Sequence, residues 1–151
     1  MRALSRRGTL PIAVAIVIGC IIGYVAYSQL FKQSQGWRLK LRLDGKDVAV
    51  YTLDELEALA ENVTIEGKAY HAVPLTKLLA DAGVSANKVR SFVAVGADGY
   101  KREIDAKYLG RAYVWIVPKE ERARQGPLRL VVEGLSHKWW VKYLVEIELR
   151  S

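Results

Sequence analysis

The sequence has 151 residues, 51% of them hydrophobic, enough for one domain of ordinary size plus an additional segment, because about 100 to 150 residues fill a single core. Four of the 23 Lys and Arg residues lie in residues 1–35, which contain no Asp or Glu. Residues 36–151 carry 19 basic and 16 acidic residues, a net charge of +3. This near balance argues against a nucleic-acid-binding domain. A single cysteine, Cys20, and two distant histidines, His71 and His137, exclude an internal disulfide framework, a multi-cysteine metal site and a zinc motif.

Residues 10–27 (LPIAVAIVIGCIIGYVAY) form a run of 18 residues without a charge. As a helix this run would span roughly 27 Å, close to the thickness of bilayer hydrocarbon, and it lacks the polar stripe of a core helix. The sequence therefore predicts one transmembrane helix. The alternative is a cleaved signal peptide, because Ala26-Tyr27-Ser28 is a small-x-small site.

Positive charge lies on one side of the apolar segment. Arg2, Arg6 and Arg7 precede it, whereas the nearest base after it is Lys32. This bias predicts a basic cytoplasmic tail at 1–9 and a single pass through the cell membrane, with the C-terminal part outside.

Two small residues and a linker complete the predicted membrane region. Gly19 and Gly23 form a GxxxG pair, which would let another membrane helix pack closely. Residues 28–36 (SQLFKQSQG) are polar and short, so they predict a linker to an outer domain at 37–151.

The outer domain begins with a predicted hairpin and a short helix. Residues 37–43 (WRLKLRL) alternate apolar with basic, which is typical of a strand, and Asp44-Gly45 provides the turn into a second strand at 48–51. Thr52 followed by Glu55 is a capping box before an apolar pattern of helical spacing, which predicts a helix over 52–60.

A second hairpin and a second helix follow. Residues 63–65 and 68–72 are predicted strands about the Glu66-Gly67 turn. Pro74 suits the first turn of a helix, Gly83 suits its left-handed end, and the apolar positions between them share one face.

The rest of the domain is predicted to be mainly strands. We expect strands at 90–95, 100–104, 112–117, 128–133 and 143–149, a turn at 105–110 and a charged exposed loop at 119–126. Many short strands with two short helices between them indicate an α+β fold with a mainly antiparallel sheet.

The segment 136–143 (SHKWWVKY) is the candidate binding region. It contains two indoles, a phenol, an imidazole and two ammonium groups, and cations beside aromatic rings suit an anionic ligand that is flat or carries phosphate. His137, Lys138 and Lys142 are the predicted anion-binding residues, and Trp139, Trp140 and Tyr143 a predicted ligand or partner surface. As a strand, the segment would place Trp140 and Lys142 on one face and Trp139, Val141 and Tyr143 on the other. The alternative interpretation is a core face with a solvated edge.

Four stretches resemble motifs of the molybdopterin-binding domain of the sulfite oxidase and periplasmic methionine sulfoxide reductase family. Residues 72–84 (AVPLTKLLADAGV) are similar to GVPLxxLLxxAGV, and residues 93–104 (VAVGADGYKREI) to the DGY hairpin. Residues 126–134 (GPLRLVVEG) are similar to GPLRLVVPG, and residues 141–149 (VKYLVEIEL) to VKWLxxIxV. The resemblance covers about residues 68–151 and implies that domain's fold.

The resemblance also implies chemistry from which this sequence departs. In the family, a cysteine before the GVPL helix coordinates molybdenum, and thiolate is a soft ligand. Residues 62–72 contain no cysteine and are reduced to the Glu66-Gly67 turn. Lys142 matches a lysine that lies near the cofactor phosphate in the family.

These observations favour a membrane-anchored, non-catalytic domain with no cofactor, which acts as an accessory subunit of a membrane complex. The expected partners are the bilayer, other subunits of the complex and a small anionic ligand, but no nucleic acid. The alternative is a molybdopterin-dependent oxidoreductase, or a subunit that supplies part of such a site.

Overall fold

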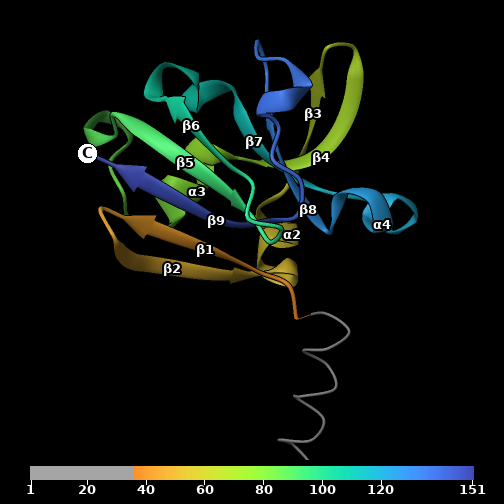
Figure 1. Cartoon of the computed structure of the whole chain (residues 1–151), viewed down its shortest axis with the longest axis horizontal. Coiled ribbons are helices and arrows are strands. Elements are labelled where there is room, and N and C mark those ends of the chain that lie inside the picture. Colours follow the sequence, from red (N-terminus) through yellow and green to blue (C-terminus); the bar gives the residue numbers. More distant parts are fainter. Residues whose placement is uncertain (1–35) are drawn as a thin grey trace, which may run out of the picture. The chain divides into compact units, whose positions relative to one another are not determined.

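A computed structural model describes residues 36–151 (Figure 1), of which Trp37–Ser151 form one compact unit. The predicted transmembrane helix, including Gly19 and Gly23, and the basic tail lie outside the described residues, as does the predicted linker except for Gly36. Within the described range, no helix combines the length and apolar character needed to cross a membrane.

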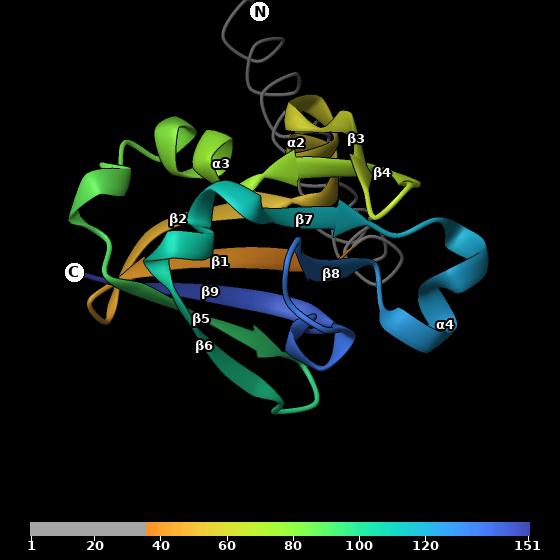
Figure 2. The ribbon, with the colours of Figure 1, turned by 90° about the horizontal axis from the view of Figure 1, so that it is seen from above.

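Two β-sheets form the unit (Figures 1 and 2), and one hydrophobic core contains buried side chains of both. The strand order is β2-β1-β9-β5-β6 in one sheet and β3-β4-β7-β8 in the other. The strand pairs are antiparallel except for β1 with β9, which confirms the predicted mainly antiparallel domain. The strands are β1 Arg38–Leu43, β2 Lys46–Thr52, β3 Glu61–Ile65, β4 Lys68–Pro74, β5 Ser91–Gly96, β6 Lys101–Asp105, β7 Ala112–Ile116, β8 Leu128–Val132 and β9 Leu144–Arg150.

Short helices connect these strands. The two predicted helices are α2 and α3, which lie along one side of the unit, while α4 projects at one end (Figure 2). The α-helices of the described range are α2 Leu53–Leu59, α3 Leu75–Asp81 and α4 Arg122–Gln125, and the 3₁₀-helices are η1 Ala86–Lys88, η2 Ala106–Arg111, η3 Lys119–Glu121 and η4 His137–Trp139.

The first two hairpins and the first predicted helix have the expected chemistry. Asp44 and Gly45, like Glu66 and Gly67, all have positive φ, which gives the type I′ geometry that two-residue hairpins favour. The Thr52 capping box at α2 is present.

Three sequence predictions about loops and turns need correction. Residues 119–126 are not an irregular loop, because the helix-favouring residues between Pro118 and Gly126 form η3 and α4. Residues 105–110 extend beyond a turn into η2, since the Asp105 side chain caps it by accepting from the Lys107 N–H at 2.8 Å. Pro74 ends β4 and occupies the N-cap position of α3 without a side-chain capping bond, instead of lying inside the first turn.

Tyr51 links β2 to α3 and generates a prediction about alkaline pH. The residue is 4% exposed, and its hydroxyl donates to Asp81 Oδ2 at 2.8 Å. Burial first, and then the bond to Asp81, raise the pKa of Tyr51 far above its ordinary value. The pKa of Tyr51 is higher in the folded state than in the unfolded state. The neutral phenol therefore contributes fully to the free energy of unfolding below about pH 10, and this contribution is lost as the pH rises further.

We therefore expect Tyr51→Phe to lower the free energy of unfolding by about 1 kcal/mol at neutral pH. We also expect the stability of this variant to fall less steeply than that of wild type as the pH rises above about 10. Urea denaturation of both proteins across the alkaline range measures the two slopes. Tyr113→Phe, at a partly exposed tyrosine in β7, is the control. Identical alkaline slopes in wild type and Tyr51→Phe would contradict the assignment.

Candidate functional site

An open groove of about 570 Å³ collects cationic and aromatic side chains from three parts of the chain. The turn between β5 and β6 provides one wall, strand β8 provides an arginine, and the segment between β8 and β9 provides the rest. Three side chains are Lys or Arg and one is acidic, so the groove is positively charged. The lining residues are Asp98, Tyr100, Arg129, His137, Lys138, Trp140 and Lys142.

Hydrogen bonds to its backbone carbonyls hold the β8–β9 segment against strand β8 and against the β5–β6 turn. The Tyr100 hydroxyl donates to the Lys138 carbonyl at 2.5 Å, and the Leu130 N–H donates to the Val141 carbonyl at 2.9 Å. The Ala97 N–H donates to the Tyr143 carbonyl at 2.7 Å. The structure thereby brings together the three residues predicted to bind an anion, which are His137, Lys138 and Lys142.

The predicted strand alternation across this segment is wrong. Residues 137–139 form η4, and Tyr143 has φ 54°. Trp140 and Val141 are adjacent and both buried, at 3% and 0% exposure, which an alternating strand does not allow. The reason is the Trp140 indole, whose Nε1–H donates to the Val132 carbonyl at 2.9 Å and so folds the segment back over the end of β8.

Trp140 forms the floor of the groove and orients two of its side chains. The His137 ring stacks on it with centroids 4.0 Å apart and an interplanar angle of 25°. The Arg129 guanidinium carbon lies 5.3 Å from the Trp140 ring centroid. The buried Tyr70 ring packs edge-on against Trp140, with the two ring centroids 6.2 Å apart.

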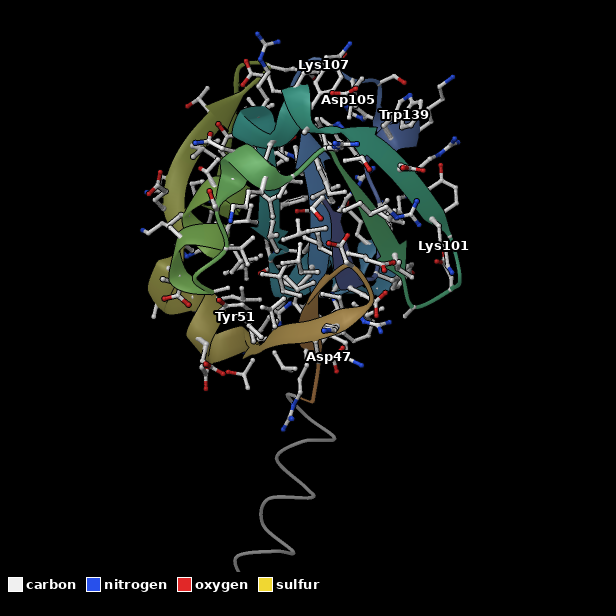
Figure 3. The ribbon with its side chains drawn as sticks, turned by 90° about the vertical axis from the view of Figure 1, so that its left-hand side faces the viewer. Asp47, Tyr51, Lys101, Asp105, Lys107 and Trp139 are labelled. Carbon is white, nitrogen blue, oxygen red and sulfur yellow. The ribbon has the colours of Figure 1, made fainter. Side chains whose placement is uncertain are left out.

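The other two aromatic residues predicted for a ligand or partner surface make contacts outside the groove. The Arg102 guanidinium carbon lies 4.9 Å from the Trp139 ring centroid. Figure 3 shows Trp139 at the end of the unit away from Tyr51. The Tyr143 hydroxyl donates to the Ala123 carbonyl at 3.0 Å. A role of Trp139 or Tyr143 toward a ligand stays a prediction.

Arg129 was not identified from the sequence, although it supplies a partly buried positive charge to the groove. It is half-buried in β8, its Nη1–H donates to Gln125 Oε1 at 2.7 Å, and its buried Nε has no acceptor. Among residues 36–151 it forms no ion pair with a carboxylate, and burial lowers the pKa of its guanidinium. A partly desolvated cation without a carboxylate partner is unfavourable, so an anion bound beside Arg129 would stabilise the site.

Asp98 and Tyr100 were also missed as lining residues. Both belong to the DGY stretch, and Arg129 to GPLRLVV, so the resemblance contained a signal for each. It did not indicate their contact with segment 136–143, because that contact comes from the pairing of β5 with β9.

A solved structure shares the fold. The crystal structure of the sulfane dehydrogenase SoxCD from Paracoccus pantotrophus matches 77% of this chain with a TM-score of 0.56 and 21% sequence identity. The match covers 38% of the SoxCD chain, so the protein corresponds to less than half of that molecule. No protein-family model and no curated protein matches the sequence. The similarity shows that this domain shares its fold with part of the SoxCD chain.

The described residues do not fit the metal centre that the family resemblance implies. Cys20 is the single cysteine of the sequence, so residues 36–151 supply no thiolate. They also contain no cluster of three His, Cys, Asp or Glu side chains arranged for a metal ion. The groove nevertheless offers the donors that a phosphate or carboxylate group requires.

Gly126 generates a prediction about how the groove is supported. Its φ of 75° and ψ of 174° are almost exclusive to glycine. A Cβ there would lie 2.7 Å from Tyr143 Cδ1 and 2.9 Å from Tyr143 Cα. We expect Gly126→Ala to lower the free energy of unfolding by more than about 2 kcal/mol, as measured by urea denaturation. Gly110→Ala is the matched control, because nothing lies within 4 Å of its Cβ position. Equal stability of the two variants would contradict the argument.

Arg129 generates a prediction about anion binding. Loss of a hydrogen bond to a charged group costs about 1.5–3 kcal/mol, so Arg129→Gln should weaken binding of inorganic phosphate at least about tenfold. Titration calorimetry on the full chain in mild detergent measures the affinity. Arg124→Gln, at an exposed arginine of α4 that does not line the groove, should bind like wild type. Equal losses in the two variants would point to general surface charge instead of the groove.

Proposed function

We propose that the protein is a membrane-anchored, non-catalytic domain of the molybdopterin-related fold, which acts as an accessory subunit of a membrane complex and binds an anionic group in its groove. The observation that carries the anion-binding part of this proposal is Arg129, a half-buried cation without a carboxylate partner among residues 36–151, in a groove whose other cations are Lys138 and Lys142.

The absence of a thiolate from the outer domain supports a non-catalytic role. A fold by itself does not define an activity, because function depends on the residues placed on it. The similarity to SoxCD extends over 38% of that chain, so most of the SoxCD chain has no counterpart here. A domain that keeps the fold and an anion groove, but lacks the metal ligand, is suited to binding a partner or ligand.

The N-terminal sequence supports the anchor and the partner. Residues 10–27 are uncharged, and Arg2, Arg6 and Arg7 precede them, which favours a single span with the outer domain on the far side from the cytoplasm. Gly19 and Gly23 give this segment a small-residue face, and such faces pack against other membrane helices.

A second candidate function is a molybdopterin-dependent oxidoreductase, or a subunit that completes one. Its support is the shared fold with a sulfane dehydrogenase. It requires that another chain supplies the metal ligands that residues 36–151 lack. The two functions differ in whether molybdenum accompanies the purified protein.

The test is purification from native membranes in mild detergent, followed by native mass spectrometry and elemental analysis. We expect the chain in the membrane fraction, with at least one other subunit at fixed stoichiometry and without stoichiometric molybdenum or pterin fluorescence after oxidation. Arg129→Gln should remain in the membrane fraction, since anchoring does not depend on the groove. A monodisperse monomer would contradict the accessory role, and molybdenum at one per complex would support the oxidoreductase.

A further inference from the structure

Four cations connect the groove to its rim. Arg129, Lys138 and Lys142 line the groove. Arg102 is joined to them through the Tyr100 hydroxyl, which accepts from Arg102 Nε at 2.6 Å and donates to the Lys138 carbonyl. None of the four cations forms an ion pair with a carboxylate among residues 36–151. Positive charge is therefore unbalanced at this surface, although residues 36–151 as a whole are nearly balanced.

Two carboxylates beside this surface are engaged by other groups. Glu103 of β6 pairs with Arg150, with 3.3 Å between Oε1 and Nη1. Asp98 is the single acidic residue of the groove lining, and its Oδ1 accepts from the Tyr100 N–H at 3.1 Å. An anionic group from another molecule would therefore supply the negative charge that the four cations lack.

Aromatic rings hold Arg102 in place at one side of the groove. Its guanidinium carbon lies 4.9 Å from the Trp139 ring centroid and 5.2 Å from the Tyr100 ring centroid. Because Nε is bonded to the Tyr100 hydroxyl, the two Nη groups are the donors left for a partner. Trp, Tyr and Arg are the residue types that most often dominate the binding energy of protein interfaces. We call Tyr100, Arg102 and Trp139 the aromatic rim.

The lining of the groove is mostly exposed. The exposed lining residues are Asp98, Tyr100, His137, Lys138 and Lys142. Sites for small molecules typically bury about 70–90% of the ligand surface, which so open a lining does not favour. Arg102 and Trp139 do not line the groove, so a small oxyanion bound at Arg129 does not require them. A segment of chain with several carboxylates can fill the groove and also cross the rim.

We propose that the groove and the aromatic rim together form the docking surface for an acidic segment of the partner subunit, with one of its carboxylates bound at Arg129. The inference rests on the proposed accessory role and identifies the anionic group as carboxylates of the partner chain. A protein segment is favoured over a bilayer surface because Arg129 is half-buried in the groove, where an inserted side chain reaches it and a flat surface does not.

Three probes test this by titration calorimetry on the full chain in mild detergent. They are a blocked octapeptide of alternating Glu and Ala, the same peptide with Gln in place of every Glu, and inorganic phosphate. We expect wild type to bind the Glu peptide at least about tenfold more tightly than the Gln peptide. Binding of the Glu peptide should weaken as salt is added, because salt screens exposed charges.

Variants of the rim distinguish a docked segment from a small ion. Arg102→Gln and Trp139→Ala should each weaken binding of the Glu peptide about five- to tenfold and change phosphate affinity less than about threefold. Retained phosphate binding also shows that the groove of each variant is folded. Arg129→Gln should weaken binding of both probes. Arg38→Gln should bind the Glu peptide like wild type.

Arg38 is the matched control for Arg102. It is an exposed arginine of the same sheet without a carboxylate partner among residues 36–151. Its strand β1 is separated from β6 by β9 and β5. Equal losses in Arg38→Gln and Arg102→Gln would show that net charge alone attracts the peptide, and would overturn the proposal.

Three further results would overturn the docking surface. They are equal affinity of wild type for the Glu and Gln peptides, unchanged binding of the Glu peptide in both rim variants, and displacement of that peptide by phosphatidylglycerol but not by phosphatidylcholine added to the micelles. The last result would assign the surface to a lipid headgroup.

Phosphate separates failure of this inference from failure of the proposed anion groove. Phosphate binding that depends on Arg129, without a preference for the Glu peptide, overturns the inference and leaves the anion groove intact. Absence of phosphate binding, with binding of the Glu peptide that depends on the rim, contradicts a groove for small anions and supports the docking surface.

Discussion

Trp140 connects the apolar core of this domain to its surface groove. Its indole nitrogen donates to the Val132 carbonyl at 2.9 Å, and its ring is 3% exposed and meets Tyr70 edge-on from the core side. On the groove side the same ring supports Arg129 and His137. A buried donor needs an acceptor, and this hydrogen bond ties the segment after β8 back to the end of that strand. The groove cations of this segment lie on either side of Trp140 in the chain.

Close backbone approach completes the groove at its other wall. A Cβ at Gly96 would lie 2.6 Å from the Lys142 carbonyl oxygen and 2.7 Å from Asp98 Oδ1, so only glycine lets the end of β5 lie against the segment before β9. The Asp98-Gly99 turn then places Tyr100 over the backbone of Lys138. The charged side chains at the surface thus depend on the packing of small and apolar residues beneath them.

This protein shares a fold with a known enzyme but lacks one of the ligands that the family resemblance implies. The two-sheet architecture is shared with a sulfane dehydrogenase of much greater length, whereas the soft ligand that a molybdenum site needs is missing from residues 36–151. At the place where the resembled family has a longer loop with that ligand, this chain has the Glu66-Gly67 turn, and the turn brings a carboxylate to His137.

The sequence by itself determined the local elements, because their causes are local. Thr52 with Glu55 starts α2, Asp44-Gly45 and Glu66-Gly67 make tight turns, and period-two alternation marks the strands. It also identified His137, Lys138 and Lys142 as neighbours, since they are close in the chain. Only the tertiary structure decided that Arg129 lines the groove with these three residues. It also decided that Trp140 is buried beneath them and does not share a strand face with Lys142. Finally, it brought Glu66 to His137, which is 71 residues away along the chain. Those contacts depend on strand pairing and on the hydrogen bond of one buried indole, which neither periodicity nor spacing reveals.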